Sequence, residues 1–335
     1  MLFFVRRLFA RLSHCLIAAS ICLSANAAES ANYSERPAVR EFIVAMEREH
    51  GMDEARLRAL FGSVQRQDRV LELMQKPAEK RLEWWEYRKI FLTDERIAAG
   101  VEFWREHEDT LARAQLRYGV PASVIVAIIG VETFFGRISG GFPALDTLTT
   151  LAFDYPRRAK FFKAELEQYL LLTRETGLPV EQLKGSYAAA FGLPQFISSS
   201  YREYAVDFDD DGKRDLWNSV EDAAGSVANY LYRHGWKNGQ AIVEPVQWKK
   251  AANGLLAKRL PKPEHDLNAL KRAGIYPKRK GNGTYSLLQL QGSQQAEYWI
   301  GHHNLYVITR YNHGTLYAMA VFQLSDASRS RYLGN

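Results

Sequence analysis

The stretch VIVAIIGVETFFG, residues 124–136, is almost wholly apolar, yet it carries one carboxylate, Glu132, near its end. Pro121, shortly before it, is a residue that helices accept in their first turn, and Gly136 is one at which helices end. The stretch therefore predicts a buried helix with Glu132 in its last turn. Burial and the negative end of the helix dipole both disfavour the ionised carboxylate. Both effects raise the pKa of Glu132 and favour a carboxyl that holds its proton near neutral pH.

A protonated carboxyl that faces a cleft is suited to one kind of chemistry. Cleavage of a glycosidic bond needs a proton for the leaving oxygen, and a glutamic acid with a raised pKa supplies it. The simpler alternative is a glutamate at a helix end whose side chain only reaches solvent. The stretch alone favours this alternative slightly, so the rest of the sequence has to decide.

Apolar periodicity predicts helices before this stretch. Residues 38–53 and 96–119 carry apolar side chains that recur every three and four positions. Gly51 and Gly119 stand where these helices should end. From about residue 36 the chain is therefore predicted to be helical.

More helices are predicted after the stretch. Residues 146–177 predict two helices, with Asp146 as the N-cap of the first and Pro156 at the break between them. Residues 219–236 predict another helix, which begins at Ser219.

The pattern of the sequence changes after Trp236. Residues 285–292, 296–302 and 304–312 are short, β-branched and aromatic, and they are bounded by Gly and Asn. These features predict three strands of a small sheet. The segment before them, residues 249–275, is basic and predicted to be helical in part.

The predicted fold class is mainly α, with N-terminal helices, a helical core and a small C-terminal antiparallel β subdomain. The predicted boundaries are a signal peptide at 1–27, an N-terminal helical region at 28–94, a core at 95–240 and an α/β subdomain at 241–335 that completes the cleft. The length of 335 residues is sufficient for several packed regions of this kind.

The first 27 residues have the pattern of a secretory signal. Three arginines precede an apolar run that closes with Ala25-Asn26-Ala27, which predicts cleavage after Ala27. The run is short for a membrane span. Cys22 is a candidate for lipid attachment, but Ile21 precedes it where lipoprotein signals require a small residue. We therefore expect a soluble exported protein of the periplasm rather than a lipoprotein.

Removal of the signal changes the cysteine count and the charge. Cys15 and Cys22 both lie in the signal, so the mature chain has no cysteine and no disulfide. The formal net charge of +6 falls to +3 because the signal holds three arginines and no acidic residue. This small excess of positive charge fits attraction to a polyanionic surface, but it is too small to indicate nucleic-acid binding.

Three motifs decide whether Glu132 is a catalytic acid or a glutamate that only reaches solvent. The first is GVETFFG, residues 130–136. The second is GSYAAAFGLPQFISSSY, residues 185–201, which is rich in small residues, and the third is RYNHGTLYAMAV, residues 310–321. With these motifs in this order, residues 36–324 resemble the lytic transglycosylase B family, glycoside hydrolase family 103.

The resemblance implies a lysozyme-like helical core and a peptidoglycan exotransglycosylase, which is a lyase. Such enzymes cleave the β-1,4 bond between N-acetylmuramic acid and N-acetylglucosamine without adding water. The muramoyl 6-hydroxyl attacks its own anomeric carbon and leaves a 1,6-anhydro ring, and one carboxyl acts first as acid and then as base. Two alternatives stay open, namely a non-catalytic peptidoglycan-binding scaffold and a hydrolytic muramidase on the same fold.

The resemblance also assigns residues. Glu132 matches the catalytic glutamate, and Ser186 matches a serine that assists near it. Residues that match the sugar cleft or its surroundings are Tyr87, Arg157, Arg158, Gln195, Tyr311, Asn312 and Tyr317. Each also has a simpler reading as a cap, a core residue or a solvated cation. Asp146 and Asp154 are weak candidates for a second catalytic carboxylate, which is consistent with one-carboxyl chemistry.

A second site is predicted in the sequence DFDDDGKRDLWNSVED, residues 207–222. Asp207, Asp209, Asp211 and the following glycine fit the first half of a calcium-binding EF-hand loop. The second half departs from that pattern, because the usual closing glutamate position is occupied by an asparagine. By the family resemblance, Glu221 and the carbonyl of Lys213 complete the site. Hard oxygen ligands favour calcium, in a structural role. The alternative is a solvated acidic turn.

The expected partners follow from the resemblance and the charge. They are peptidoglycan glycan strands, with cell-wall synthases as candidate protein partners, no nucleic acid, and a monomeric enzyme. No cofactor is expected to take part in the chemistry.

Overall fold

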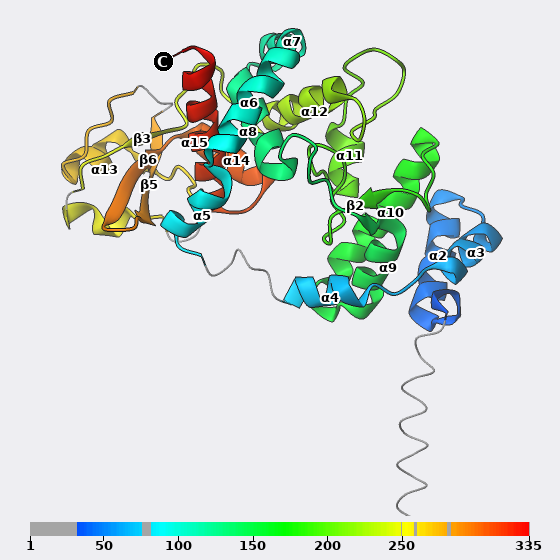
Figure 1. Cartoon of the computed structure of the whole chain (residues 1–335). Coiled ribbons are helices and arrows are strands. Elements are labelled where there is room, and N and C mark those ends of the chain that lie inside the picture. The colour runs from blue at the N-terminus through cyan, green and yellow to red at the C-terminus, as the bar shows by residue number, and fades with distance from the viewer. Residues whose placement is uncertain (1–31, 76–81, 249, 258–259, 280–282, 335) are drawn as a thin grey trace, which may run out of the picture. The chain divides into compact units, whose positions relative to one another are not determined.

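The structure is a computed structural model that describes residues 32–75, 82–248, 250–257, 260–279 and 283–334 (Figure 1). The predicted signal peptide, with Cys15 and Cys22, lies outside these residues. The contacts divide the chain into two compact units. The first unit comprises residues 32–72 and 145–167 of the described chain, and the second comprises the remainder. The domain boundaries predicted at residues 94 and 240 stay a prediction.

The first unit is helical. It contains η2 (Tyr33–Glu35), α2 (Pro37–His50), α3 (Glu54–Ser63), the start of α4 (Asp68–Gln75), most of α9 (Ala144–Asp154), η4 (Pro156–Arg158) and the first half of α10 (Ala159–Thr176). As predicted, α2 ends at Gly51, which has a φ of 61°.

The break between α9 and α10 is confirmed, but the predicted start of α9 is wrong. The 3-10 turn η4 begins at Pro156, as expected from the residue that interrupts helices. Asp146 is not the N-cap, because α9 begins two residues earlier at Ala144 and Asp146 lies in its first turn. The Asp146 carboxylate instead accepts a hydrogen bond of 3.2 Å from Gln67 Nε2.

The second unit has a helical part and a sheet. Its helices are α5 (Trp84–Phe91), α6 (Asp94–Glu106), α7 (Glu108–Tyr118), α8 (Ala122–Thr133), α11 (Ser198–Tyr204), α12 (Val220–Arg233), α13 (Leu267–Arg272), α14 (His303–Tyr311) and α15 (Thr315–Tyr332), with η5 at Lys250–Leu255. As predicted, α7 ends at Gly119, and α12 begins after Ser219, whose side chain accepts a hydrogen bond from the Asp222 N–H.

Helix α8 is the centre of this unit (Figure 1). It packs against α6, α7, α12 and α15. Of its twelve residues, Glu132 is the one that is not buried. A helix that is apolar all round belongs in a core, so the predicted buried helix with Glu132 in its last turn is confirmed. The predicted end at Gly136 is wrong, because α8 ends at Thr133 with Phe134 as its C-cap. The core helix therefore presents a single carboxylate at its C-terminal end.

The strands form two antiparallel sheets. β1 (Phe142–Pro143) pairs with β2 (Lys184–Gly185). The larger sheet has the order β3-β6-β5-β4, formed by β3 (Val243–Pro245), β6 (Ala296–Gly301), β5 (Thr284–Gln291) and β4 (His265–Asp266). Two of the three predicted strands, 285–292 and 296–302, correspond to β5 and β6.

The third predicted strand is wrong, because residues 304–312 belong to helix α14. Asn304, Leu305 and Ile308 are buried together with Val307 and Thr309, whereas Tyr306 and Arg310 are only partly buried. This spacing is that of one helix face. Tertiary burial has outweighed the strand preference of the β-branched residues.

Among the described residues, no single helix is long and apolar enough to cross a membrane. Helices α7 and α8 reach the required length and composition only together, and they meet at a bend of 113°.

Candidate active site and metal loop

Glu132 is followed by a strained turn. Phe134 and Phe135 have φ angles of 50° and 58°, and Gly136 follows with 86°. A non-glycine residue in the left-handed region costs about 1–2 kcal/mol, and such residues persist only where their surroundings hold them. The turn directly beyond the carboxylate is therefore fixed by the packing around it.

The side chains of Thr133 and Phe135 hold this turn in place. The Thr133 hydroxyl is buried and donates a hydrogen bond of 3.0 Å to the Leu193 carbonyl. The ring of Phe135 lies over Gly130, so closely that a Cβ at Gly130 would come within 2.6 Å of it. The backbone after Glu132 is thus tied both to a second loop and to its own helix.

Arg96 on α6 contacts the other aromatic ring of the turn. Its guanidinium lies 4.5 Å from the ring centroid of Phe134, and Arg137 lies 4.9 Å from the same ring. Arg96 is buried, which lowers its pKa, and it donates a hydrogen bond to the Ile90 carbonyl. This residue could not be predicted from the sequence, because a lone arginine in an amphipathic helix is usually solvated.

Tyr317, in the first turn of α15, makes the most direct contact with the candidate catalytic residue. Its hydroxyl donates a hydrogen bond of 2.6 Å to Glu132 Oε1. Burial raises the pKa of Tyr317 well above its usual value, and the negative charge of Glu132 raises it further. The phenol therefore stays protonated and is a permanent donor to this carboxyl.

Two further predicted tyrosines lie close to Tyr317. The ring of Tyr311 is parallel to that of Tyr317 at a centroid distance of 6.5 Å, and its hydroxyl donates a hydrogen bond of 2.6 Å to the Pro194 carbonyl. Tyr87 on α5 is buried and near enough to contribute to the raised pKa of Tyr317. Tyr311 and Tyr317 thus lie near the Glu132 carboxyl, and Tyr87 lies near Tyr317.

Gln195 and Ser186 lie in the loops that face the strained turn. Gln195 has a φ of 50°, and its Nε2 donates to the carbonyls of Gly192 at 2.9 Å and Ser139 at 3.2 Å. Ser186 Oγ accepts a hydrogen bond of 3.1 Å from the Ala190 N–H, which closes a tight turn.

A close approach of two backbones joins the Ser186 loop to the chain that follows Glu132. A Cβ at Gly140 would lie 2.3 Å from the Gly185 carbonyl oxygen and 2.6 Å from the Ser186 nitrogen. Gly140 also has a φ of 85°. Only glycine meets both requirements, so residue 140 is part of the site architecture, although it was not predicted from the sequence.

The remaining predicted substrate residues are Asn312, Arg157 and Arg158. Asn312 is the exposed C-cap of α14, directly after Tyr311. Arg157 and Arg158 lie in η4 of the first unit, where the Arg158 guanidinium is 4.1 Å from the ring centroid of Phe161. The part of these two arginines in substrate binding stays a prediction.

The two alternative carboxylates have structural partners in the first unit. Asp154 accepts hydrogen bonds of 2.5 Å from Arg36 Nη2 and from the Tyr33 hydroxyl. Burial alone would raise its pKa, but Arg36 and Tyr33 hold the pKa of Asp154 below its usual value. Burial raises the pKa of Asp146, which is bonded to Gln67. Both carboxylates therefore have hydrogen-bond partners that tie them to the packing of the first unit.

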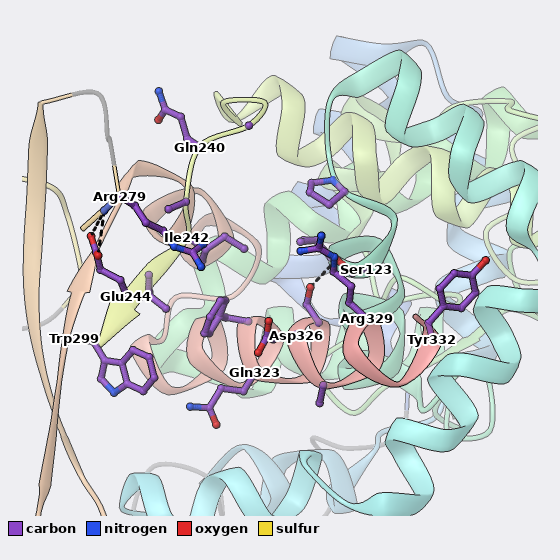
Figure 2. Close-up of a pocket in the computed structure, with 18 of the residues that line it drawn as sticks. Ser123, Gln240, Ile242, Glu244, Arg279, Trp299, Gln323, Asp326, Arg329 and Tyr332 are labelled. Atoms are coloured by element: carbon purple, nitrogen blue, oxygen red, sulfur yellow. Dashed lines mark hydrogen bonds between the residues drawn. The ribbon is translucent and has the colours of Figure 1, made fainter. Parts of the chain in front are cut away.

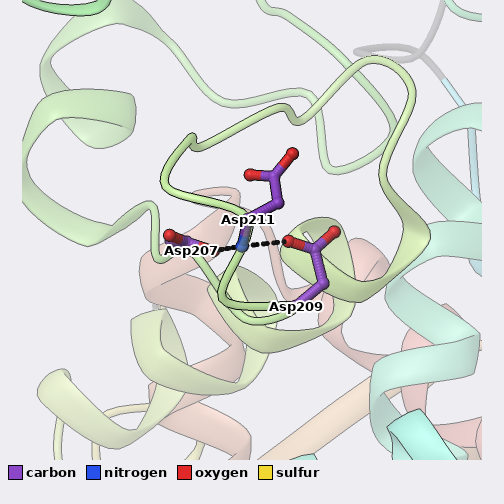
Figure 3. Close-up of side chains that lie close together, drawn as sticks. All are labelled: Asp207, Asp209 and Asp211. Atoms are coloured by element: carbon purple, nitrogen blue, oxygen red, sulfur yellow. Dashed lines mark hydrogen bonds between the residues drawn. The ribbon is translucent and has the colours of Figure 1, made fainter.

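The predicted metal loop brings three carboxylates together. One ligand oxygen from each of Asp207, Asp209 and Asp211 lies within 4.8 Å of the others (Figure 3). The Asp211 and Gly212 N–H groups donate to Asp207, and the Lys213 N–H donates to Asp211. These residues fit a hard divalent cation, because three oxygen donors converge without a neutralising cation among them. Glu221, in the first turn of α12, does not belong to this group of three.

A fourth acidic residue, which the sequence analysis missed, holds the loop in shape. Asp222 is buried, and its two oxygens accept hydrogen bonds of 2.6 Å from the Phe208 N–H and 2.7 Å from the Asp215 N–H. Burial raises its pKa, and the nearby charges of Asp209 and Asp207 raise it further. The pattern Ser219-x-x-Asp222 is a capping-box signature and was a usable signal for this position.

Comparison with known proteins gives consistent results. Residues 34–326 match the family described as the transglycosylase SLT domain. The chain is 43% identical over 309 residues to the membrane-bound lytic murein transglycosylase B of Escherichia coli K12, and the match covers 88% of this chain and 84% of that protein.

Two solved structures are similar over almost the same length. The soluble lytic transglycosylase SltB1 of Pseudomonas aeruginosa has a TM-score of 0.84 and 44% identity, over 89% of this chain and all of that one. The Escherichia coli lytic transglycosylase Slt35 in complex with calcium has a TM-score of 0.82 and 42% identity, over 89% of this chain and 95% of that one.

Proposed function

The chain belongs to the lytic murein transglycosylase B family, and we propose that it is an active lytic transglycosylase in which Glu132 is the single acid and base. Its substrate is then peptidoglycan, cleaved between N-acetylmuramic acid and N-acetylglucosamine to leave a 1,6-anhydro end. The observation that carries the assignment of the residue is the contact between Glu132 and Tyr317, at the end of α8, which is otherwise buried throughout.

The proposed reaction has two proton transfers through one carboxyl. Glu132 first donates its proton to the leaving glycosidic oxygen as the bond to the anomeric carbon breaks. The muramoyl 6-hydroxyl then bonds to that carbon, and its proton goes to the Glu132 carboxylate. The acid form of the enzyme is restored, and no water is consumed.

Tyr317 has a positioning role in this scheme. Because its hydroxyl donates to Oε1, that oxygen is held as an acceptor in both protonation states of Glu132. The transferred proton is then carried by Oε2. A permanent donor also favours the carboxylate that forms after the first step, since a hydrogen bond to a charged acceptor is stronger than one to a neutral acceptor.

The other predicted residues complete the proposed substrate site. Ser186 assists near the N-acetyl group or the reacting carboxyl, while Tyr87, Gln195, Tyr311 and Asn312 line the glycan. Sugar sites favour this combination of aromatic rings and amides, because sugars have apolar faces edged by hydroxyl groups. Arg157 and Arg158 are proposed to contact the glycan or its peptide stem.

Calcium has a structural role in the proposal. Asp207, Asp209 and Asp211 would hold it, with the Lys213 carbonyl and Glu221 as further ligands. A bound cation would neutralise the repulsion between the three carboxylates and stabilise the loop between α11 and α12. It would take no part in the chemistry.

Several finer points belong to the same proposal. The enzyme acts from strand ends, works as a monomer, and is a soluble periplasmic protein after removal of residues 1–27. Cell-wall synthases are candidate partners. The relatives in the comparisons include both a membrane-bound and a soluble transglycosylase, so location is not decided by family membership.

Digestion of purified sacculi in oxygen-18 water tests the reaction. The proposal expects anhydro ends without label from the solvent. A hydrolytic muramidase would instead give reducing N-acetylmuramic acid ends that carry the label. A non-catalytic scaffold would release no fragments.

A further inference from the structure

A large groove in the second unit is separate from the proposed catalytic residues. Its volume is about 1460 Å³, and its floor is the half of α15 from Phe322 to Tyr332 (Figure 2). Its walls come from α5 to α8, from β3 and β6, and from the loop at Lys278 and Arg279. Neither Glu132 nor any predicted sugar-cleft residue lines it. We call it the basic groove.

The charges that line the basic groove are unbalanced. Lys278, Arg279 and Arg329 form no salt bridge with any residue in the described part of the chain. Among the groove's carboxylates, Glu297 lies 3.4 Å from Arg88. Asp326, on α15, lines the groove without a salt-bridge partner among the described residues.

The remaining groove carboxylate, Glu244, is buried and fixes the loop that carries two of the cations. It accepts hydrogen bonds of 2.8 Å from the Lys278 N–H and 3.2 Å from the Arg279 N–H, and it lies 3.0 Å from His302 Nε2 (Figure 2). These are bonds to the main chain. Glu244 therefore holds the loop while leaving both side chains exposed at the rim of the groove.

The distribution of charge along the sequence supports a specialised surface. Residues 249–280 contain ten lysines and arginines but only two acidic residues, which gives this segment a net charge of +8. The whole chain has +6, of which the first 27 residues carry +3, so the rest of the mature chain has −5. Lys278 and Arg279 are the two of these ten cations that line the groove, and a positive local charge of this kind attracts an anionic partner.

The groove also offers apolar and amide surfaces. The rings of Trp104 and Tyr332 are stacked at one end with a centroid distance of 4.4 Å, and the side chain of Leu116 is 88% exposed at its edge. Gln240 lines the opposite wall, and its Oε1 is buried without a hydrogen-bond partner among the described residues. A ligand that complements these surfaces has carboxylates, amide N–H groups and small apolar side chains. An acidic peptide has all three.

We propose that the basic groove binds the carboxylate-bearing stem peptides of peptidoglycan, outside the site that cleaves the glycan. This inference rests on the proposed function, because that function supplies the polymer. Helices α8 and α15 both extend from the catalytic carboxyl to the groove, since Glu132 and Tyr317 lie at one end and Ser123 and Arg329 line the groove. A peptide held in the groove would keep the polymer near Glu132 and raise its effective concentration there.

Charge reversal with a matched control tests the inference. In an inactive Glu132→Gln background, we expect Lys278→Glu/Arg279→Glu to weaken binding to intact sacculi by about tenfold, because two contacting charges become repulsive. Lys271→Glu/Arg272→Glu on α13 changes the net charge equally, and both residues are exposed and lie outside the groove lining. This control should bind like the parent. Equal losses in both variants, or no loss in either, would overturn the proposal.

A second arm identifies the ligand. On sacculi whose stem peptides have been removed by an amidase, the groove variant and the parent should bind equally. If the groove variant remains weaker there, the groove binds glycan and the peptide assignment is wrong. Lys278→Gln/Arg279→Gln repeats the test if charge reversal prevents folding.

Failure of the proposed function can be told apart from failure of this inference. The chain with Glu132 intact is assayed for anhydro ends on the same sacculi. If it forms none, the proposed function fails. The difference in sacculus binding between the groove variant and the control variant still shows whether the groove binds the polymer.

Discussion

The hydroxyl of Tyr317 lies 2.6 Å from Oε1 of Glu132, although 185 residues separate the two in sequence. The contact joins the C-terminal end of α8 to the first turn of α15. It fixes one oxygen of the proposed acid and base with a donor whose own pKa is raised by burial and by Glu132. The catalytic geometry therefore depends on the packing of these two helices.

Replacement of Tyr317 by phenylalanine tests this dependence. The ring remains and only the donor is lost, so we expect the free energy of unfolding to fall by about 1 kcal/mol. We expect kcat to fall by roughly tenfold to a hundredfold with little change in KM, because a preorganised donor to a developing charge is lost. Tyr169→Phe is the matched control, since its buried hydroxyl donates to the Val180 carbonyl and has no assigned part in the site. Unchanged kcat in Tyr317→Phe would remove Tyr317 from the mechanism.

The sequence predicted the central helix and its carboxylate because both depend on local pattern. Residues 124–136 are apolar on every face, and a segment of this kind has to be buried. It also pointed to Tyr311 and Tyr317, but only through a family resemblance. Their relation to Glu132 is a tertiary contact, which periodicity and local propensity do not encode.

Other features of the site could not be predicted for related reasons. The left-handed φ angles of Phe134 and Phe135 are imposed by their surroundings, and a phenylalanine gives no local sign of them. Arg96 is buried by two aromatic rings from other segments. The strand wrongly predicted at residues 304–312 is a further case in which burial outweighed the local preference.

Glu132→Gln should abolish cleavage while leaving the fold intact. The amide keeps the shape of the side chain and can still accept the Tyr317 hydrogen bond, but it cannot supply the proton. Loss of the general acid should lower the rate by about a hundredfold to ten-thousandfold or more. The measurement is the release of anhydro fragments from purified sacculi, with circular dichroism as the control for folding. A loss of less than about tenfold would refute the assignment, because it is smaller than the loss of about a hundredfold expected when a general acid is removed.

Calcium should raise the thermal stability through the aspartate cluster. Binding to the folded state alone stabilises by about 2.7 kcal/mol at a hundredfold excess over Kd. Asp209→Asn should remove this gain, because Asp209 supplies one of the three converging oxygens. Asp210→Asn makes the same charge change at the adjacent position, outside the cluster, and should keep the gain. Identical melting curves in calcium and in chelator for the parent would argue against a metal site.

The buried tyrosines should make the protein lose stability at alkaline pH. Burial raises the pKa of Tyr201, Tyr230, Tyr311 and Tyr317 above the usual value of 10.0. Above about pH 10 the unfolded chain releases these protons while the folded chain retains them, so the free energy of unfolding falls as the pH rises. Below that pH both states are protonated, and this contribution to stability is fully present. Urea unfolding from pH 8 to about pH 11 measures the slope.

A pair of substitutions identifies which tyrosines are responsible. Tyr201 is completely buried, and its hydroxyl donates to the Arg214 carbonyl. Tyr201→Phe should lower the stability at neutral pH but reduce the alkaline slope, because one retained proton is removed from the folded state. Tyr276 is 67% exposed, and Tyr276→Phe should leave the slope unchanged. If both variants lose stability with pH as steeply as the parent, the alkaline transition has another origin, such as the net charge of the protein.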